Sequence, residues 1–402
     1  MTGFDRYGQL LGKPHVAAMT AAALLARVPL GIIGLAIVLF LREETGSYAA
    51  AGAVAAAFAV GTGAAAPYAG RLVDRLGSAR VLLPMSVVHA TAIALLVALG
   101  YGKAPLPTLI GASAVAGCAL PPISSVMRTL WPSLLGRRDD LVTTAFALDA
   151  VIVELVFVTG PALVALLTAL LAPAAALALS SVVSLVGTLV FATRPPARAR
   201  KPVPRVEGAG AFGALRARGL QTLMLGTVPI GFALGATEVI LPAFSEAEGN
   251  RALAGVLLTV WSIGSAAGGI VYGARGHARP LADRFVRFAV LLPFSLLPLA
   301  LAPSIAVMFL LVVPAGAIIA PTLAAGNQLV AEVTPPGQQT EAFTWPLTAL
   351  VLGVAGGNAV AGAVVEAADW QTAFLVAATA GLASGAVLLL RRDTLRPLSA
   401  PA

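Results

Sequence analysis

The chain has 402 residues, of which 58% are hydrophobic and only 11% are charged, and its formal net charge is +8. Its mean hydropathy is +0.92. Soluble domains usually contain about 25% charged residues, so this composition excludes a water-facing surface of ordinary size. The apolar stretches exceed the roughly 18 residues that mark a spanning helix, and the short alternating segments of a β-barrel are absent. The sequence therefore predicts an all-α membrane protein.

In chain order, the apolar stretches and the turns between them predict twelve transmembrane helices. Their approximate ranges are 16–41, 47–69, 80–100, 106–133, 141–171, 173–193, 219–243, 252–273, 285–303, 305–330, 341–365 and 369–390. The first stretch is too long for a signal peptide and is expected to stay as the first span. An even number of spans places both termini on one side of the membrane.

The basic residues predict which side this is. With a cytoplasmic N-terminus, all but four of the 26 Lys and Arg lie in or beside cytoplasmic segments, the exceptions being Arg27, Arg42, Lys103 and Arg251. The positive-inside rule therefore predicts two cytoplasmic termini, and the basic charge indicates topology, with no nucleic-acid partner. The richness in Ala, Gly, Pro and Arg indicates a GC-rich bacterial genome, so we expect a multi-pass protein of the bacterial inner (plasma) membrane.

The longest connection, residues 194–218, contains seven basic residues and four prolines. It predicts a cytoplasmic linker between an N-terminal six-helix half, residues 1–193, and a C-terminal six-helix half, residues 219–402.

The two halves repeat each other at an offset of about 200 residues. The sequence VPLG at 28–31 matches VPIG at 228–231. Four further glycines match in the same order, in the pairs Gly61 and Gly264, Gly70 and Gly273, Gly117 and Gly316, and Gly160 and Gly357. An even helix count in each half makes this a parallel repeat.

The loop after the second predicted span contains Gly70, Asp74, Arg75, Gly77 and Arg80. The pattern resembles the cytoplasmic loop signature of the major facilitator superfamily, which has Gly, three residues, Asp-Arg, one residue, Gly and then basic residues. Here two residues separate Gly77 from Arg80, and the second-half counterpart at 273–279 lacks the acid. The helix count and the repeat extend the resemblance to the whole chain. It implies a transporter that works by alternating access.

The chemistry of this loop suits a cytoplasmic gate. Gly70 permits close helix approach, and Asp74 can accept hydrogen bonds from a helix N-terminus of the other half or pair with an arginine. The alternative is that Asp74, Arg75 and Arg80 are topology charges only.

The fifth predicted span contains Gly160-Pro161. This dipeptide resembles the end of the glycine-rich motif of proton-coupled exporters in this superfamily, and it favours export over uptake. The alternative is a simple proline kink with a glycine for close packing.

Ionisable residues inside the membrane cost about 2.5 kcal/mol or more each at the bilayer centre, so they are candidates for proton coupling or substrate binding. Arg27 lies about eleven residues into the first span, roughly 16 Å along its axis. Asp149 and Glu154 lie in the fifth span, which by resemblance is a neighbour of the first. Because they differ by about 140° around the helix, we expect one acid to meet Arg27 and the other to face the cavity or the eighth span. The alternative is a structural ion pair.

Further candidates are less specific. Glu238, in the outer third of the seventh span, is a coupling or substrate acid at the cavity mouth or a solvated rim residue, whereas Glu341 is expected to cap its helix or to be an interfacial charge. Arg128 can extend along its helix to the interface and is expected to be structural. The residues expected to line the cavity, although aromatic side chains more often pack, are Trp261, Asn327, Gln328 and Trp345.

No Walker A sequence, nucleophile–base pair or metal-ligand cluster occurs in the sequence. We therefore expect no enzyme activity, cofactor or metal. The prediction is a monomeric secondary transporter whose partners are protons, the lipid bilayer and a small-molecule substrate. Its favoured activity is proton-coupled antiport that exports a small amphipathic drug or metabolite. The alternatives are a proton-coupled symporter that imports a small nutrient and a membrane protein that does not transport.

Overall fold

The computed structural model describes residues 4–136, 138–199, 213–250, 253–335 and 337–396, and these contain helices and no strands. Twelve helical segments of this part are long and apolar enough to cross a membrane, which confirms the predicted all-α fold and number of spans. They are Val16–Thr45, Ala50–Leu76, Ser78–Tyr101, Leu106–Leu135, Asp140–Leu170, Pro173–Thr193, Arg218–Ala247, Ala254–Ala274, Leu281–Leu301, Ile305–Val333, Gln339–Ala367 and Trp370–Leu390. The chain is therefore a multi-pass membrane protein.

The helices of the first half and the linker are α1 (Asp5–Leu11), α2 (Val16–Arg27), α3 (Pro29–Thr45), α4 (Tyr48–Leu76), α5 (Ser78–Tyr101), α6 (Leu106–Cys118), α7 (Ile123–Leu135), α8 (Asp139–Leu170), α9 (Pro173–Thr193), α10 (Pro195–Ala199) and η1 (Ala214–Arg216). Those of the second half are α11 (Arg218–Ala247), α12 (Ala254–Ala274), α13 (Leu281–Leu296), η3 (Leu297–Leu301), α14 (Ile305–Gly316), α15 (Ile319–Val333), α16 (Gln339–Ala367), α17 (Trp370–Leu390) and η4 (Arg392–Leu395). Most of the predicted linker, residues 200–212, lies outside the described residues.

Three predicted spans are broken, and proline accounts for the breaks. The first span divides into α2 and α3 at Val28, directly before Pro29, and the fourth divides into α6 and α7 around Pro121 and Pro122. The tenth divides into α14 and α15 at residues 317–318, and the ring of Pro321 would clash with the carbonyl of Ala317 in a continuous helix. The first break leaves Arg27 at the end of a helix inside the membrane.

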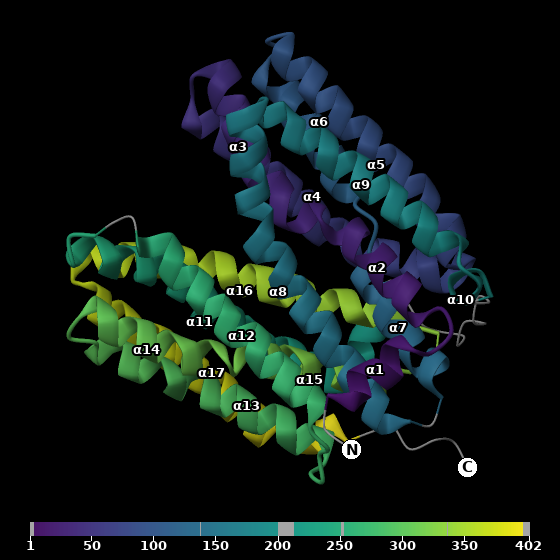
Figure 1. Cartoon of the computed structure of the whole chain (residues 1–402), viewed down its shortest axis with the longest axis vertical. Helices are drawn as coiled ribbons and strands as arrows, with labels where there is room; N and C mark the ends of the chain where they lie inside the picture. Colours follow the sequence, from purple (N-terminus) through teal and green to yellow (C-terminus); the bar gives the residue numbers. More distant parts are fainter. Residues whose placement is uncertain (1–3, 137, 200–212, 251–252, 336, 397–402) are drawn as a thin grey trace.

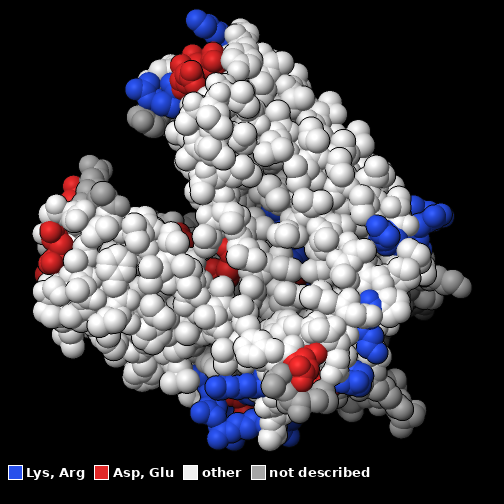
Figure 2. Space-filling model, in the orientation of Figure 1, with Lys and Arg blue, Asp and Glu red and all other residues white. Residues whose placement is uncertain are grey.

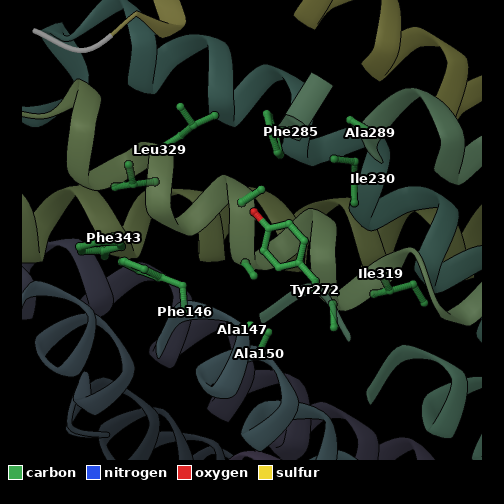
Figure 3. Close-up of a cluster of buried hydrophobic side chains, with 14 of the residues drawn as sticks. Phe146, Ala147, Ala150, Ile230, Tyr272, Phe285, Ala289, Ile319, Leu329 and Phe343 are labelled. Atoms are coloured by element: carbon green, nitrogen blue, oxygen red, sulfur yellow. The ribbon is translucent and has the colours of Figure 1, made fainter. Parts of the chain in front are cut away.

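The helices form two bundles that diverge from one end of the molecule, with α2 to α9 in one and α11 to α17 in the other (Figure 1). We call the common end, where the described ends of the linker and α1 lie, the linker end. A buried cluster there includes side chains of both bundles, such as Phe146 of α8, Tyr272 of α12 and Phe343 of α16 (Figure 3). A second cluster, with Ile32, Phe40 and Leu96, contains residues of the first bundle alone. The bundles therefore share a core at the linker end.

The repeated glycines lie where helix backbones touch. Gly31 of α3 lies against the Val156 carbonyl of α8, and Gly231 of α11 lies against the Leu350 carbonyl of α16, so that a Cβ at either glycine would overlap the backbone. Gly117 and Gly316 lie in the same way against the carbonyls of Phe58 and Trp261, respectively. The sequence repeat is therefore a repeat of helix crossings, in which the absence of a side chain permits close packing.

Candidate functional site

A hollow separates the two bundles away from the linker end, and acidic side chains lie at its base (Figure 2). Basic side chains gather instead around the linker end, near α13 and the chain termini (Figures 1 and 2). The candidate site has two parts. One is the set of charged residues near the base of the hollow, and the other is the contact between the bundles that closes the linker end.

Arg27 and Asp149 form a buried ion pair, with Nη2 of Arg27 2.6 Å from Oδ1 of Asp149. The second carboxylate oxygen, Oδ2, accepts a hydrogen bond of 2.7 Å from Nε of Arg128 on α7. One carboxylate is thus shared by two guanidinium groups, and the three side chains together carry one positive charge. Arg128 does not extend to the interface, because its guanidinium points to Asp149 and the residue is buried.

Glu154 has different surroundings from Asp149. Its Oε1 accepts a hydrogen bond of 2.8 Å from the hydroxyl of Ser265, so this contact joins α8 of the first bundle to α12 of the second. The side chain is half-buried, and it is close enough to Glu238 of α11 for the two carboxylates to interact electrostatically. Glu238 is exposed. A group that is accessible to water and faces a second acid can exchange protons more readily than one held between two arginines.

At the linker end, the last turns of α4, which contain Gly70, Arg71 and Asp74 of the recognised motif, contact the start of α16. Asp74 is buried, and its two carboxylate oxygens accept hydrogen bonds from the backbone N–H groups of Thr340 (3.2 Å) and Glu341 (3.0 Å). These groups belong to the first turn of α16, where the helix dipole stabilises a negative charge. Arg71 donates two hydrogen bonds of 3.2 Å to the Glu341 carboxylate. We call this contact the α4–α16 seam.

Gly70 makes the α4–α16 seam sterically possible. A Cβ on Gly70 would lie 2.9 Å from the Cα of Glu341, so a larger residue would force the two helices apart. Gly77 follows with a φ of 87°, a conformation that favours glycine, and it ends α4 so that α5 can begin at Ser78. The side chains of Arg75 and Arg80 are exposed. The geometry thus places Gly70 and Asp74 against the other bundle, whereas the two basic residues lie at the surface.

At the linker end, the equivalent contact of the repeat, which we call the α8–α12 seam, is made by uncharged donors. Thr144 donates a hydrogen bond of 2.7 Å to the carbonyl of Gly273, which is the counterpart of Gly70. Tyr7 of α1 donates a hydrogen bond of 3.0 Å to the carbonyl of Ile270, and burial raises the pKa of its phenol to about 12. Both donors are uncharged. Helix α1, which precedes the first bundle in the chain, therefore also contacts the second.

The remaining predicted residues are distributed over several environments. Gln328 is buried, and its Oε1 accepts a hydrogen bond of 3.2 Å from Thr143 across the bundles, whereas Asn327 and Trp345 are half-buried and Trp261 is buried. Gly160 lies against the backbone of Gly31, and Pro161 stays inside the uninterrupted α8. The structure therefore brings together Arg27 with Asp149, and Glu154 with Glu238.

Several residues that complete these contacts were not identified from the sequence, namely Arg71, Thr143, Thr144, Ser265 and Tyr7. Arg71 lies within the recognised loop, and its position next to Gly70 was an available signal. A single Ser or Thr in an apolar helix gives no such signal, because these side chains also hydrogen-bond to their own helix backbone.

Two bundles of six spans related by a parallel repeat, with charged residues near a central hollow, have the architecture of a membrane transporter. Models of the Major Facilitator Superfamily match residues 19–290 and 223–402 of this sequence. The chain belongs to the major facilitator superfamily, whose members are transporters. No curated protein sequence matches the chain significantly.

Solved structures share this fold at low sequence identity. A bacterial homologue of the iron transporter ferroportin, in an outward-facing state, is 14% identical and has a TM-score of 0.78, with 94% of this chain and 99% of that chain covered. The human organic anion transporter TETRAN is 20% identical, with a TM-score of 0.71 and coverages of 94% and 98%. The E. coli fucose:proton symporter is 14% identical, with a TM-score of 0.71 and coverages of 93% and 98%. At these identities the similarity defines the fold and leaves the substrate open.

Proposed function

We propose that this transporter exports a small amphipathic drug or metabolite in exchange for protons. The observation that carries the proposal is Glu154, a half-buried acid that reaches from one bundle to Ser265 of the other and faces Glu238. When Glu154 loses its proton, two carboxylates interact across the bundles and repel each other. Protonation removes this repulsion, so proton binding is coupled to the relative position of the bundles.

The basic residues around the linker end support an inner-membrane orientation in which this end faces the cytoplasm. In this orientation the hollow opens to the outside and the α4–α16 seam is the cytoplasmic gate. Protons would enter from the outer side, along the gradient, and reach Glu154 without crossing the closed seam. The functional unit is one chain, with residues 1–193 and 219–402 as the two moving halves and 194–218 as the linker between them.

The test separates coupling from substrate binding. Wild-type protein and the variant Glu154→Gln are reconstituted in proteoliposomes, with Glu246→Gln as a control on the exposed end of α11. Candidate amphipathic substrates are first screened for transport by the wild type. The Glu154→Gln variant should lose transport driven by a pH gradient and retain exchange of labelled substrate. If Glu154→Gln keeps gradient-driven transport, the coupling role of this residue is wrong.

A second candidate function is proton-coupled uptake of a small nutrient, which the fold shared with a fucose:proton symporter favours. The two directions differ in one result. An exporter accumulates substrate in inside-out vesicles when the lumen is acidified, whereas a symporter in the same vesicles moves substrate out with the protons. A protein that shows no counterflow with any compound would instead be a membrane protein without transport activity.

A further inference from the structure

A cavity of about 1000 Å³ lies at the linker end, on the opposite side of the seams from the hollow. Its wall combines α1, the first turns of α8, the loop 275–280, α13 and η4. This volume is at the upper end of the usual range for small-molecule sites. The charged side chains among its lining residues are Arg6, Asp140, Arg275, His277, Asp283, Arg284, Glu332, Arg392, Asp393 and Arg396.

The acids of this cavity do not balance its arginines. Asp140 is already paired with Arg138 at 3.0 Å, and Asp393 is paired with Arg396 at 2.8 Å. Within the part of the chain that the structure describes, Arg6, Arg275 and Arg392 form no ion pair with a protein acid.

Three of the arginines converge on one imidazole. His277 lies between α12 and α13, and burial, followed by the charges of Arg284, Arg6 and Arg275, lowers its pKa. Its Nε2 donates a hydrogen bond of 2.9 Å to the carbonyl of Tyr272. The cavity is also lined by Asp283 and Glu332, which are fewer than the four arginines other than Arg396, so positive charge remains in excess and an anion would compensate it.

Arg284 has an unused donor in this cluster. Its Nη1 donates a hydrogen bond of 2.9 Å to the phenol oxygen of Tyr272, which fixes the direction of the guanidinium. Its Nε is buried and has no hydrogen-bond partner among the described residues. A buried donor of a charged group that stays unpaired is costly, and an oxyanion in the cavity would satisfy it.

We propose that this cavity binds a phosphate group through Arg6, Arg275 and Arg284. A guanidinium donates in a planar fork that matches two phosphate oxygens, and three such groups around one anion form a strong binding site. Arg6 comes from α1, whereas Arg275 and Arg284 come from the second bundle. A bound phosphate therefore ties α1 to the second bundle and stabilises the state in which the linker end is closed. The group belongs either to a soluble phosphate compound or to the headgroup of an anionic lipid.

The test uses the full-length protein in nanodiscs of phosphatidylcholine, with inorganic phosphate as the probe. Binding is measured by calorimetry and by the midpoint of thermal unfolding, with sodium chloride at the same ionic strength as the reference. We expect phosphate to bind and to raise the unfolding temperature. Arg275→Gln, at an exposed position, should weaken phosphate binding at least tenfold. Arg287→Gln, also exposed and on α13 but outside the cavity lining, should leave it unchanged.

A second arm distinguishes the two sources of the phosphate group. If the natural ligand is a lipid headgroup, nanodiscs with phosphatidylglycerol should raise the unfolding temperature of the wild type and of Arg287→Gln more than that of Arg275→Gln. Stabilisation by inorganic phosphate alone indicates a soluble ligand. The proposal is wrong if neither probe stabilises the wild type beyond the chloride reference, or if Arg275→Gln responds as the wild type does.

Discussion

The α4–α16 seam gives the sharpest prediction, which concerns Asp74→Asn. Asp74 accepts two charge-assisted hydrogen bonds from the first turn of α16, one at each oxygen, and an asparagine would present to one of these donors an NH2 group, which cannot accept. The loss of one such bond, together with the interaction of the charge with the helix dipole, costs about 2 kcal/mol. A change of this size shifts the equilibrium between the closed and open linker end roughly 30-fold toward the open state.

Cysteine labelling measures this shift. Thr344 is buried and lies on the face of α16 that contacts α4, since Glu341 and Thr348 on the same face bond to Arg71 and to the carbonyl of Gly63. In a background with the exposed Cys118 replaced by serine, Thr344→Cys should react slowly with a maleimide. Adding Asp74→Asn should raise this rate by up to roughly 30-fold, as long as the open state remains the minor one.

The matched control is Asp369→Asn. Asp369 is also an aspartate at a helix N-terminus, where it accepts a hydrogen bond of 2.7 Å from the backbone N–H of Thr372, but it lies at the other end of the molecule. The Asp369→Asn variant should have little effect on the rate at which Thr344→Cys reacts with the maleimide. The role of Asp74 in closing the seam would be refuted if Asp74→Asn changed the labelling rate of Thr344→Cys by less than about threefold. It would also be refuted if Asp369→Asn raised that rate equally.

Three further predictions concern stability and topology. Asp149→Asn leaves two guanidinium groups buried without a carboxylate and should lower the free energy of unfolding by about 3–5 kcal/mol. Arg27→Met should cost less, because Asp149 still pairs with Arg128. Thermal unfolding of the purified protein measures both effects. Gly31→Ala should lower the unfolding temperature because its Cβ would overlap the α8 backbone, whereas Gly34→Ala, with nothing within 4 Å, should not. Cysteines in 194–218 should resist impermeant reagents added outside intact cells, whereas one at Asn250 should react; the reverse pattern contradicts the proposed orientation.

The number of spans and the class of fold followed from the sequence because the bilayer imposes a minimum apolar length on each helix. The repeat was visible for a related reason. Glycines such as Gly31 and Gly231 lie where two backbones touch, so a position that requires the absence of a side chain recurs in each half.

The contacts among the charged residues were harder to predict from the sequence. The rotation of about 140° between Asp149 and Glu154 predicts that they face different neighbours, but it does not say which acid meets Arg27. The direction of the Arg128 side chain was open, because a long side chain near a helix end can reach the interface as easily as a neighbouring helix. Which rotamer is adopted depends on Asp149 of the next span, and a contact between two helices is not encoded in the pattern of either one.

The two seams differ in chemistry, and this difference has a consequence for how the molecule opens. The α4–α16 seam depends on the charges of Asp74, Arg71 and Glu341, whereas the α8–α12 seam depends on the neutral hydroxyls of Tyr7 and Thr144. The side chain of Arg71 is partly exposed, so salt screens its pair with Glu341 more than it affects the neutral hydrogen bonds. High ionic strength should therefore loosen one edge of the interface before the other. The bundles would then rotate apart about an axis that lies near Tyr7 and Thr144.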